Sequence, residues 1–230
     1  MLQVNNLNAF YGESHVLHDV SLRAKEGKIT VLLGRSGMGK TTTINSIMGV
    51  HSSKKGEILF ESQEIHQKPS FEVSKTGVGL VPQGRRIFPN LTVRENLMTT
   101  FRPEKNGWTL QKIFQLFPSL KEIDTSMGGT LNGGEKLMLS IGRALLTNPK
   151  LLLIDEPAEG LTPLMVDEMI EIIKLLKRQG LTILLVEKNL AMAIEVSDDI
   201  YIINKGSIVF NGSCESLSHD VKNTYYVLSP

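Results

Sequence analysis

Residues 29–47 read Ile-Thr-Val-Leu-Leu-Gly-Arg-Ser-Gly-Met-Gly-Lys-Thr-Thr-Thr-Ile-Asn-Ser-Ile. The segment begins as an apolar, β-branched run that predicts a buried strand, and it ends as a stretch compatible with a helix. Between them, Gly34–Thr41 follows the pattern Gly-x-x-x-x-Gly-Lys-[Ser/Thr]. Glycines let the backbone turn with its N–H groups pointing inward, and the positive end of the following helix adds to their attraction for anions. We therefore predict a phosphate-binding loop, in which Lys40 reaches the β- and γ-phosphates of a nucleotide and Thr41 binds Mg²⁺.

Length and composition limit what the chain can be. Its 230 residues fit one α/β domain with attached subdomains. The formal net charge of +1 gives no excess of positive charge, so we expect no nucleic-acid partner. The single cysteine excludes an internal disulfide and favours a reducing compartment. Because no stretch is apolar and long enough to cross a bilayer, we expect any work at a membrane to depend on a partner protein.

The other segments predict strands and helices arranged around this loop. Apolar runs separated by turns before Ile29 predict antiparallel strands, and the polar residues 62–76 predict a loop. Between Leu91 and Thr147 the pattern becomes helical, with helices predicted at Trp108–Phe117 and Lys136–Thr147. Further strands are predicted at Gly56–Phe60, Gly77–Pro82, Leu151–Glu156, Thr182–Val186, Ile200–Asn204 and Ser207–Phe210.

Two adjacent carboxylates end one of these strands. The unbroken apolar run Leu151–Ile154 predicts a strand buried on both faces, and Asp155 and Glu156 follow it. Adjacent acids repel each other, and Mg²⁺ at this edge of the sheet would compensate that repulsion. We predict that Asp155 holds Mg²⁺ and that Glu156 polarises the attacking water. Gln83, directly after another short strand, is predicted to complete the Mg²⁺ coordination, the alternative being an ordinary polar loop residue.

Two further features suggest nucleotide contacts. The run Leu131-Asn132-Gly133-Gly134-Glu135 places a second glycine cluster at the start of a predicted helix, which is another geometry that binds anions. Tyr11, beside a glycine, is a candidate for stacking on an adenine ring. An aromatic residue at a strand end also packs commonly at the rim of a core, so both placements remain open for Tyr11.

In this order, the motifs resemble those of an ATP-binding-cassette (ABC) ATPase over about residues 2–212. The Leu-x-Gly-Gly-Glu signature at Leu131–Glu135 separates this family from other phosphate-loop proteins. The run Val81–Val93 is similar to the ATP-binding subunits of branched-chain amino acid importers, with urea importers close behind. The resemblance implies an α/β fold, a P-loop NTPase (RecA-like) core with an N-terminal antiparallel β-subdomain and a helical subdomain. Within this single nucleotide-binding domain, we expect the core with its β-subdomain at about 1–84 and 148–212, the helical subdomain at about 85–147 and a tail at 213–230.

The resemblance also implies an ATP hydrolase that powers a membrane importer, with ATP and Mg²⁺ as its cofactors. Tyr11 would stack on adenine, Gln83 would sense Mg²⁺ and the attacking water, and Glu156 would be the general base. Asn132, Gly133 and Gly134 would close over ATP bound on a second ATPase subunit. The positions that would wrap the phosphates are Gly34, Arg35, Ser36, Gly37, Met38, Gly39, Lys40, Thr41 and Thr42.

The implied partners are a second ABC ATPase subunit and a membrane permease. Two subunits, identical or different, would enclose two ATP molecules head to tail. The segment Arg85–Leu97 would grip transmembrane permease subunits, which places the chain at the cytoplasmic face of the cell membrane. A solute-binding protein would be an indirect partner. Branched-chain amino acids, urea and other amides all remain open as the solute.

Three positions depart from the family pattern. Asn132 replaces the signature serine, and the loop 158–162 lacks the usual serine and aspartate. Lys188 occupies the position of the switch histidine, where it either contacts the γ-phosphate as a catalytic residue or points into solvent. These departures favour a dimer with two unlike subunits and slow hydrolysis, or alternatively a mainly regulatory ATP-binding subunit. The basic pair Arg85-Arg86 is interpreted as solvated loop charge.

Overall fold

The computed structural model describes residues 1–217, and residues 218–230 lie outside the described part. Within it, a six-stranded sheet runs in the order β10-β9-β3-β8-β7-β6, with neighbours parallel except for the antiparallel pair β9 and β10. Its strands are β3 (Ile29–Leu33), β6 (Val78–Val81), β7 (Leu151–Asp155), β8 (Thr182–Glu187), β9 (Asp199–Asn204) and β10 (Ser207–Ser213). This sheet carries the predicted phosphate loop on β3 and the predicted carboxylates on β7.

A four-stranded antiparallel sheet contains most of the N-terminal residues. Its order is β2-β1-β4-β5, with β1 (Leu2–Tyr11), β2 (Ser14–Ala24), β4 (Lys54–Phe60) and β5 (Gln63–Glu64). Alternate residues of β1 point into the core on either side of an irregularity in the pairing register, with Leu2 and Val4 buried before it and Leu7 and Ala9 after it. The antiparallel strands expected before Ile29 are therefore confirmed.

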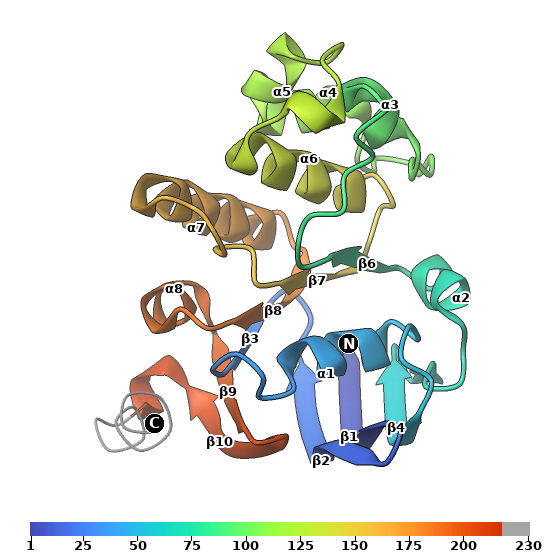
Figure 1. Cartoon of the computed structure of the whole chain (residues 1–230), viewed down its shortest axis with the longest axis vertical. Helices are drawn as coiled ribbons and strands as arrows, with labels where there is room; N and C mark the ends of the chain where they lie inside the picture. The colour runs from blue at the N-terminus through green and yellow to red at the C-terminus, as the bar shows by residue number, and fades with distance from the viewer. Residues whose placement is uncertain (218–230) are drawn as a thin grey trace.

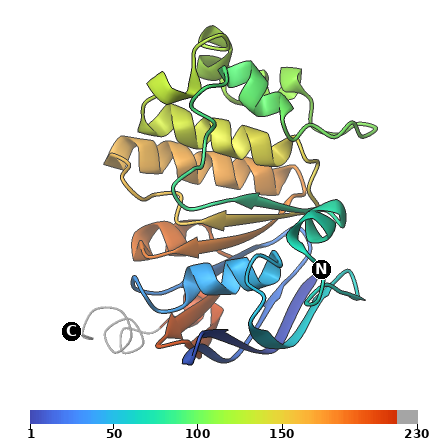
Figure 2. The ribbon, with the colours of Figure 1, turned by 45° about the vertical axis from the view of Figure 1, so that its right-hand side comes forward.

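The helices lie in layers on both sides of the six-stranded sheet (Figures 1 and 2). Helix α1 lies between the two sheets, whereas α6, α7 and α8 cover the opposite face together with the helices that lie beyond α6 (Figure 2). The helices are α1 (Lys40–Ile47), α2 (Ser70–Lys75), α3 (Val93–Met98), α4 (Leu110–Leu116), α5 (Pro118–Glu122), α6 (Gly133–Leu145), α7 (Pro163–Arg178) and α8 (Leu190–Val196), with 3₁₀ turns at Gly128–Thr130 and Cys214–Ser216.

Burial on both faces explains why the central strands are continuously apolar. Along β7, Leu152 and Ile154 pack against α6 and α7, whereas Leu151 and Leu153 pack toward α1 and the antiparallel sheet. All five residues of β7 are buried, including Asp155 at its end. A carboxylate in that position has little water around it, so its environment must be supplied by neighbouring polar groups.

Capping boxes mark the starts of two helices. Thr92 caps α3 and Asn132 caps α6, each in a capping box with the glutamate three residues later. The glycines 133 and 134 are included in α6, which begins earlier than the predicted Lys136. Helix α4 is shorter than predicted, because the hydroxyl of Thr109 caps it and leaves Trp108 outside.

The expectation of a loop over residues 62–76 is wrong. This segment contains the short strand β5 and the helix α2. Helix α2 buries a single residue, Val73, so no helical repeat of apolar residues is present to announce it. The predicted tail at 213–230 lies outside the described residues from 218 onward, and before that point β10 continues to Ser213.

Candidate functional site

The parallel strands bring four chain segments to one edge of the six-stranded sheet. The phosphate loop follows β3, Gln83 follows β6, Glu156 follows β7 and Lys188 follows β8. Because these strands are parallel, their carboxyl ends lie at the same edge, which is where open α/β sheets bind ligands. Residues predicted from four separate stretches of sequence are therefore neighbours.

Close packing and glycines in the left-handed backbone conformation determine the shape of the phosphate loop. Gly34 packs so tightly against β9 that a Cβ atom there would lie 2.7 Å from the carbonyl oxygen of Ile203. Gly37 and Gly39 have φ values of +80° and +105°, which favour glycine. The loop curls around the buried Lys40, whose Nζ donates a hydrogen bond to the Arg35 carbonyl at 2.9 Å. This arrangement is a cradle of the kind that binds phosphates.

Lys40 also forms a buried ion pair with Glu156. The distance from Nζ to Oε1 is 2.9 Å. Glu156 has a φ of +47°, in the left-handed region that a residue with a side chain rarely adopts, and its amide donates to the Val186 carbonyl at 2.9 Å. This local strain turns the Glu156 carboxylate back toward the loop, and such strained residues often occur at functional sites.

Thr41 and Asp155 form the second contact between the loop and β7. The Thr41 hydroxyl lies 3.2 Å from Asp155 Oδ1. Burial raises the pKa of Asp155 to about 6, against the lowering effect of the Thr41 hydrogen bond. A hydroxyl and a poorly solvated carboxylate side by side are oxygen donors of the kind that Mg²⁺ prefers, so these residues fit the cation. Gln83, the third predicted ligand, lines the same cavity as Thr41 but donates its amide to Glu159 at 3.0 Å.

Lys188 does not point freely into solvent. Its Nζ lies 3.1 Å from Glu159 Oε1 and 3.5 Å from Glu156 Oε2, although the side chain is 40% exposed. The hydrogen bond to Glu159 raises the pKa of Lys188. The hydrogen bond from Gln83, followed by the one from Lys188, lowers the pKa of Glu159. Both groups therefore carry full charges at neutral pH.

Three residues of this site were missed or misinterpreted from the sequence. Glu187 is 1% exposed, and its carboxylate accepts hydrogen bonds from the amides of Ala158, Lys188 and Asn189. Burial raises its pKa, whereas these backbone hydrogen bonds lower it. An acid at the end of a buried strand was the available signal, as it was for Asp155. Glu159 is not among the site residues predicted from the sequence. The interpretation of Arg85 as solvated charge is wrong, since its guanidinium donates to the Glu159 carbonyl at 2.7 Å.

A cavity of about 270 Å³ lies over the phosphate loop. It is lined by Val16, Ser36, Gly37, Gly39, Lys40, Thr41, Thr42, Gln83, Glu156 and Glu159. Among the other loop positions, the carbonyl of Arg35 is directed to Lys40, and the carbonyl of Met38 accepts the amide of Gly206 at 3.1 Å. The cavity thus collects most of the predicted phosphate contacts together with Glu156, the predicted general base, whereas Asp155 is not among its lining residues.

The other predicted nucleotide contacts do not line this cavity. Tyr11 is half-exposed, and its ring lies 4.5 Å from the ring of His51. Asn132 caps the start of α6, where its side chain accepts a hydrogen bond from the Glu135 amide at 3.0 Å. Gly133 and Gly134 form the first turn of that helix. The signature segment is therefore separate from the phosphate loop of its own chain.

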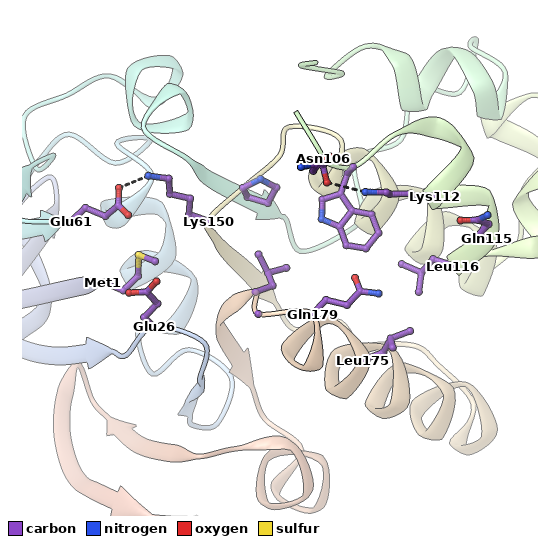
Figure 3. Close-up of a pocket in the computed structure, with 14 residues that line it drawn as sticks. Met1, Glu26, Glu61, Asn106, Lys112, Gln115, Leu116, Lys150, Leu175 and Gln179 are labelled. Carbon is purple, nitrogen blue, oxygen red and sulfur yellow. Dashed lines mark hydrogen bonds and ion pairs between the residues drawn. The ribbon is translucent and has the colours of Figure 1, made fainter. Parts of the chain in front are cut away.

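A larger cavity lies elsewhere in the described residues. It has a volume of about 960 Å³ and lies near the amino ends of the parallel strands, with Lys150 on one side and Lys112 and Gln115 of α4 on the other (Figure 3). Its cations already have partners, because Lys150 pairs with Glu61 at 2.7 Å and Lys112 donates to the Asn106 carbonyl at 2.9 Å. The loop cavity, although smaller, holds the buried charges and the strained residue, so we assign the site there.

Comparisons with known proteins identify the family of the chain. The profile of the ABC transporter family matches residues 17–159. The chain is 40% identical over 220 residues to the high-affinity branched-chain amino acid transport ATP-binding protein BraG of Pseudomonas aeruginosa, covering 94% of each chain. It is 33% identical to the lipopolysaccharide export system ATP-binding protein LptB of Haemophilus influenzae, covering 98% of this chain and 96% of LptB.

The fold is also found among solved structures. The crystal structure of the ADP conformation of MJ1267, an ATP-binding cassette of an ABC transporter, superposes with a TM-score of 0.84 at 28% identity, covering 99% of this chain and 96% of that chain. The α/β architecture with an antiparallel β-subdomain is thereby confirmed. Among the helices of residues 1–217, none combines the length and the apolar character needed to cross a membrane.

Proposed function

The chain belongs to the ABC transporter family of ATP hydrolases, and on this premise we propose that it powers a membrane importer for branched-chain amino acids. The observation that carries the proposal is the convergence of Lys40, Thr41, Asp155 and Glu156 at the phosphate loop. The identity to BraG supports branched-chain amino acids as the solute. Because LptB, which is named for lipopolysaccharide export, is also similar, the solute has to be tested by experiment.

Hydrolysis would use the geometry of the loop cavity. The amides of the loop and the Lys40 ammonium would bind the β- and γ-phosphates. Thr41 and Asp155 would hold Mg²⁺, with Gln83 as a further ligand. When bound, Mg²⁺ would neutralise negative charge on the phosphates. Glu156 would accept the proton of the attacking water once its ion pair with Lys40 has opened.

The rest of the proposed site comes from a second subunit. Because Asn132, Gly133 and Gly134 do not line the cavity of their own chain, we assign them to ATP bound on the opposing ATPase, while Tyr11 would stack on the adenine of its own site. The region around Arg85–Leu97, within a helical subdomain at about 85–147, would contact the permease. This arrangement places the chain at the cytoplasmic face of the membrane, with a solute-binding protein as an indirect partner.

A second candidate, an ATP-binding subunit with weak hydrolysis, is favoured by the contacts of Lys188. Its ammonium lies 3.5 Å from Oε2 of the proposed general base, Glu156, so this ion pair would compete with the attacking water for the carboxylate. In an asymmetric dimer, a different ATPase subunit would then supply most of the turnover. The isolated chain is expected to hydrolyse ATP much more slowly than the complete complex. Equal turnover in the two preparations would contradict the asymmetry.

Transport itself tests the solute class. The chain would be purified with its membrane subunits and its solute-binding protein and reconstituted in vesicles, with ATP on the side of this chain. We expect ATP-dependent uptake of labelled leucine and no uptake of labelled urea. ATP-dependent urea uptake without leucine uptake would replace the proposed solute, and ATP hydrolysis without any transport would contradict the importer role. Vesicles containing the Lys40→Ala chain provide the control for uptake that does not depend on ATP hydrolysis.

A further inference from the structure

Glu159 joins three loops at the edge of the phosphate cavity. Its carboxylate accepts hydrogen bonds from Gln83 Nε2 at 3.0 Å and from Lys188 Nζ at 3.1 Å. Its backbone carbonyl accepts Arg85 Nη2 at 2.7 Å. These partners follow β6 and β8, whereas Glu159 follows β7, so one residue connects the ends of three strands. The carboxylate itself lines the cavity that contains Lys40 and Thr41.

The two groups held by the Glu159 carboxylate are the ones that a terminal phosphate would need. Gln83 is the proposed sensor of Mg²⁺ and water, and Lys188 places a cation 3.5 Å from the proposed base, Glu156. A carboxylate is an anionic oxygen acceptor, as a phosphate is, and both take their strongest hydrogen bonds from charged donors. An N–H of Gln83 or Lys188 that donates to Glu159 is not available to a phosphate, so the two anions compete for these donors.

Glu159 also adds a negative charge beside the position proposed for a terminal phosphate. Asp155, Glu156 and Glu159 are close neighbours at this edge, where Lys40 and Lys188 face them and the Arg85 guanidinium lies beside Glu159. Of the three acids, Asp155 has a proposed role in holding Mg²⁺ and Glu156 a proposed role with water. Glu159 contributes a negative charge to which the proposed hydrolysis gives no role. Its side chain is 46% exposed and can turn outward without leaving a buried charge unpaired.

We propose that Glu159 is an internal competitor of the γ-phosphate, which holds Gln83 and Lys188 until a nucleoside triphosphate displaces it. The inference rests on the proposed function, since it requires ATP to bind at the phosphate loop. Glu159 acts as a positioning residue, through Gln83 and Lys188, and takes no part in bond breaking. A diphosphate has no terminal group to place between these donors. The competition therefore lowers affinity for triphosphates and leaves affinity for diphosphates unchanged.

This selectivity can be measured with AMP-PNP, which resists hydrolysis, and with ADP, both with Mg²⁺, by calorimetry on the full chain. Removing the charge in Glu159→Gln is expected to tighten AMP-PNP binding about fivefold, the upper range for one exposed ion pair, and to leave ADP binding unchanged. Glu159→Asp, which keeps the charge, should bind AMP-PNP more weakly than Glu159→Gln does. Glu168→Gln removes an exposed carboxylate from α7, outside the loop cavity, and is the matched control.

Three other outcomes would refute either the competition or the proposed function. If Glu159 only supports the loop structure, Glu159→Gln will change the affinities for AMP-PNP and ADP by the same factor, and the competition is refuted. The competition is equally refuted if Glu168→Gln produces the same gain, because the effect would then come from net charge. If the wild-type chain binds neither nucleotide, the proposed function fails, and this result is distinct from wild-type binding with an unchanged ratio of affinities.

Discussion

Lys40 Nζ lies 2.9 Å from Glu156 Oε1, and the two side chains are only 3% and 6% exposed. The pair connects the phosphate loop to the end of β7, so it holds together the two segments that carry the proposed chemistry. In the proposed hydrolysis each partner has a separate role, since Lys40 would bind phosphate and Glu156 would accept a proton. A buried pair contributes little net stability, but breaking it by removing one charge leaves the other without compensation. Substitutions at either position therefore require separate measurements of stability and activity.

Replacing Glu156 by Gln is expected to lower ATP hydrolysis by about 100-fold or more, because the general base is lost. The amide keeps the size of the side chain and can still accept a hydrogen bond from Lys40, so the fold should persist. ATP should then remain bound and hold a dimer together. Phosphate release and size-exclusion chromatography with ATP measure the two effects, with Glu168→Gln as control. Unchanged phosphate release would remove Glu156 from the role of base.

Asn132 has a structural role that can be separated from its proposed contact with ATP. Its side chain accepts the Glu135 amide, and Glu135 Oε2 accepts the Asn132 amide at 2.8 Å. Asn132→Ala should cost about 1 kcal/mol of folding free energy, whereas Asn132→Ser keeps a capping oxygen and should cost little. Thermal unfolding checks the two values.

The same pair of variants tests the signature role. If Asn132 slows closure over the ATP of a second subunit because it is bulkier than serine, Asn132→Ser will raise the turnover of the complete complex without changing the melting temperature. A serine variant with unaltered turnover would leave Asn132 with its capping role alone.

Asp198 gives the folded chain a pH dependence at a point remote from the site. Burial alone would raise the pKa of Asp198, but hydrogen bonds from Lys177, from the amide of Ile29 and from Lys28 hold it below its ordinary value. A depressed pKa in the folded chain contributes stability that is present above the unfolded-state value of 3.8 and is lost as the pH falls through the folded-state value.

We therefore expect Asp198→Asn to lower the melting temperature at pH 7 by about 4 °C, a size typical of one charged hydrogen-bond group in a chain of this length. The difference between variant and wild type should shrink as the pH is lowered below 4. Asp167→Asn, at an exposed position of α7, is the control and should show neither effect. A difference that stays constant from pH 7 to pH 3 would show that the charge of Asp198 is not responsible.

Much of the site could be predicted because its signals are local. The loop Gly34–Thr41 and the acids at the end of β7 each occupy a few consecutive residues. Their geometry follows from backbone hydrogen bonding and glycine conformation, which act over one or two turns of chain. Parallel pairing then brings the strand ends together, so the predicted residues meet without further information.

The contacts of Glu159 and Glu187 could not be predicted in the same way. Glu159 meets Lys188 and Gln83 only because β6, β7 and β8 are adjacent, and a single sequence contains no signal for contacts across so many residues. Glu187 is buried among backbone amides that belong to two different loops. Helix α2 was missed for a different reason, since one buried valine gives no helical repeat.

Gly34 and Gly37 of the phosphate loop separate two effects of adding a side chain, which are steric overlap at Gly34 and backbone strain at Gly37. A Cβ at Gly34 would lie 2.7 Å from the Ile203 carbonyl oxygen, although its φ is not in the left-handed region. Gly37 has a φ of +80°, but a Cβ there would meet no atom within 4 Å. Gly34→Ala must move β9 or the loop, at a cost of about 2 kcal/mol for overpacking, whereas Gly37→Ala costs about 1 kcal/mol of backbone strain.

We expect Gly34→Ala to lower the melting temperature by about 6 °C and Gly37→Ala by about 3 °C. Gly37→Ala should still weaken AMP-PNP binding at temperatures where the chain stays folded, because its methyl group enters the cavity over the loop and not the protein interior. Thermal unfolding and calorimetry on the same preparations measure both quantities. If Gly37→Ala is the less stable variant, conformation outweighs packing in this loop. If it binds AMP-PNP as the wild type does, the phosphates do not lie against Gly37.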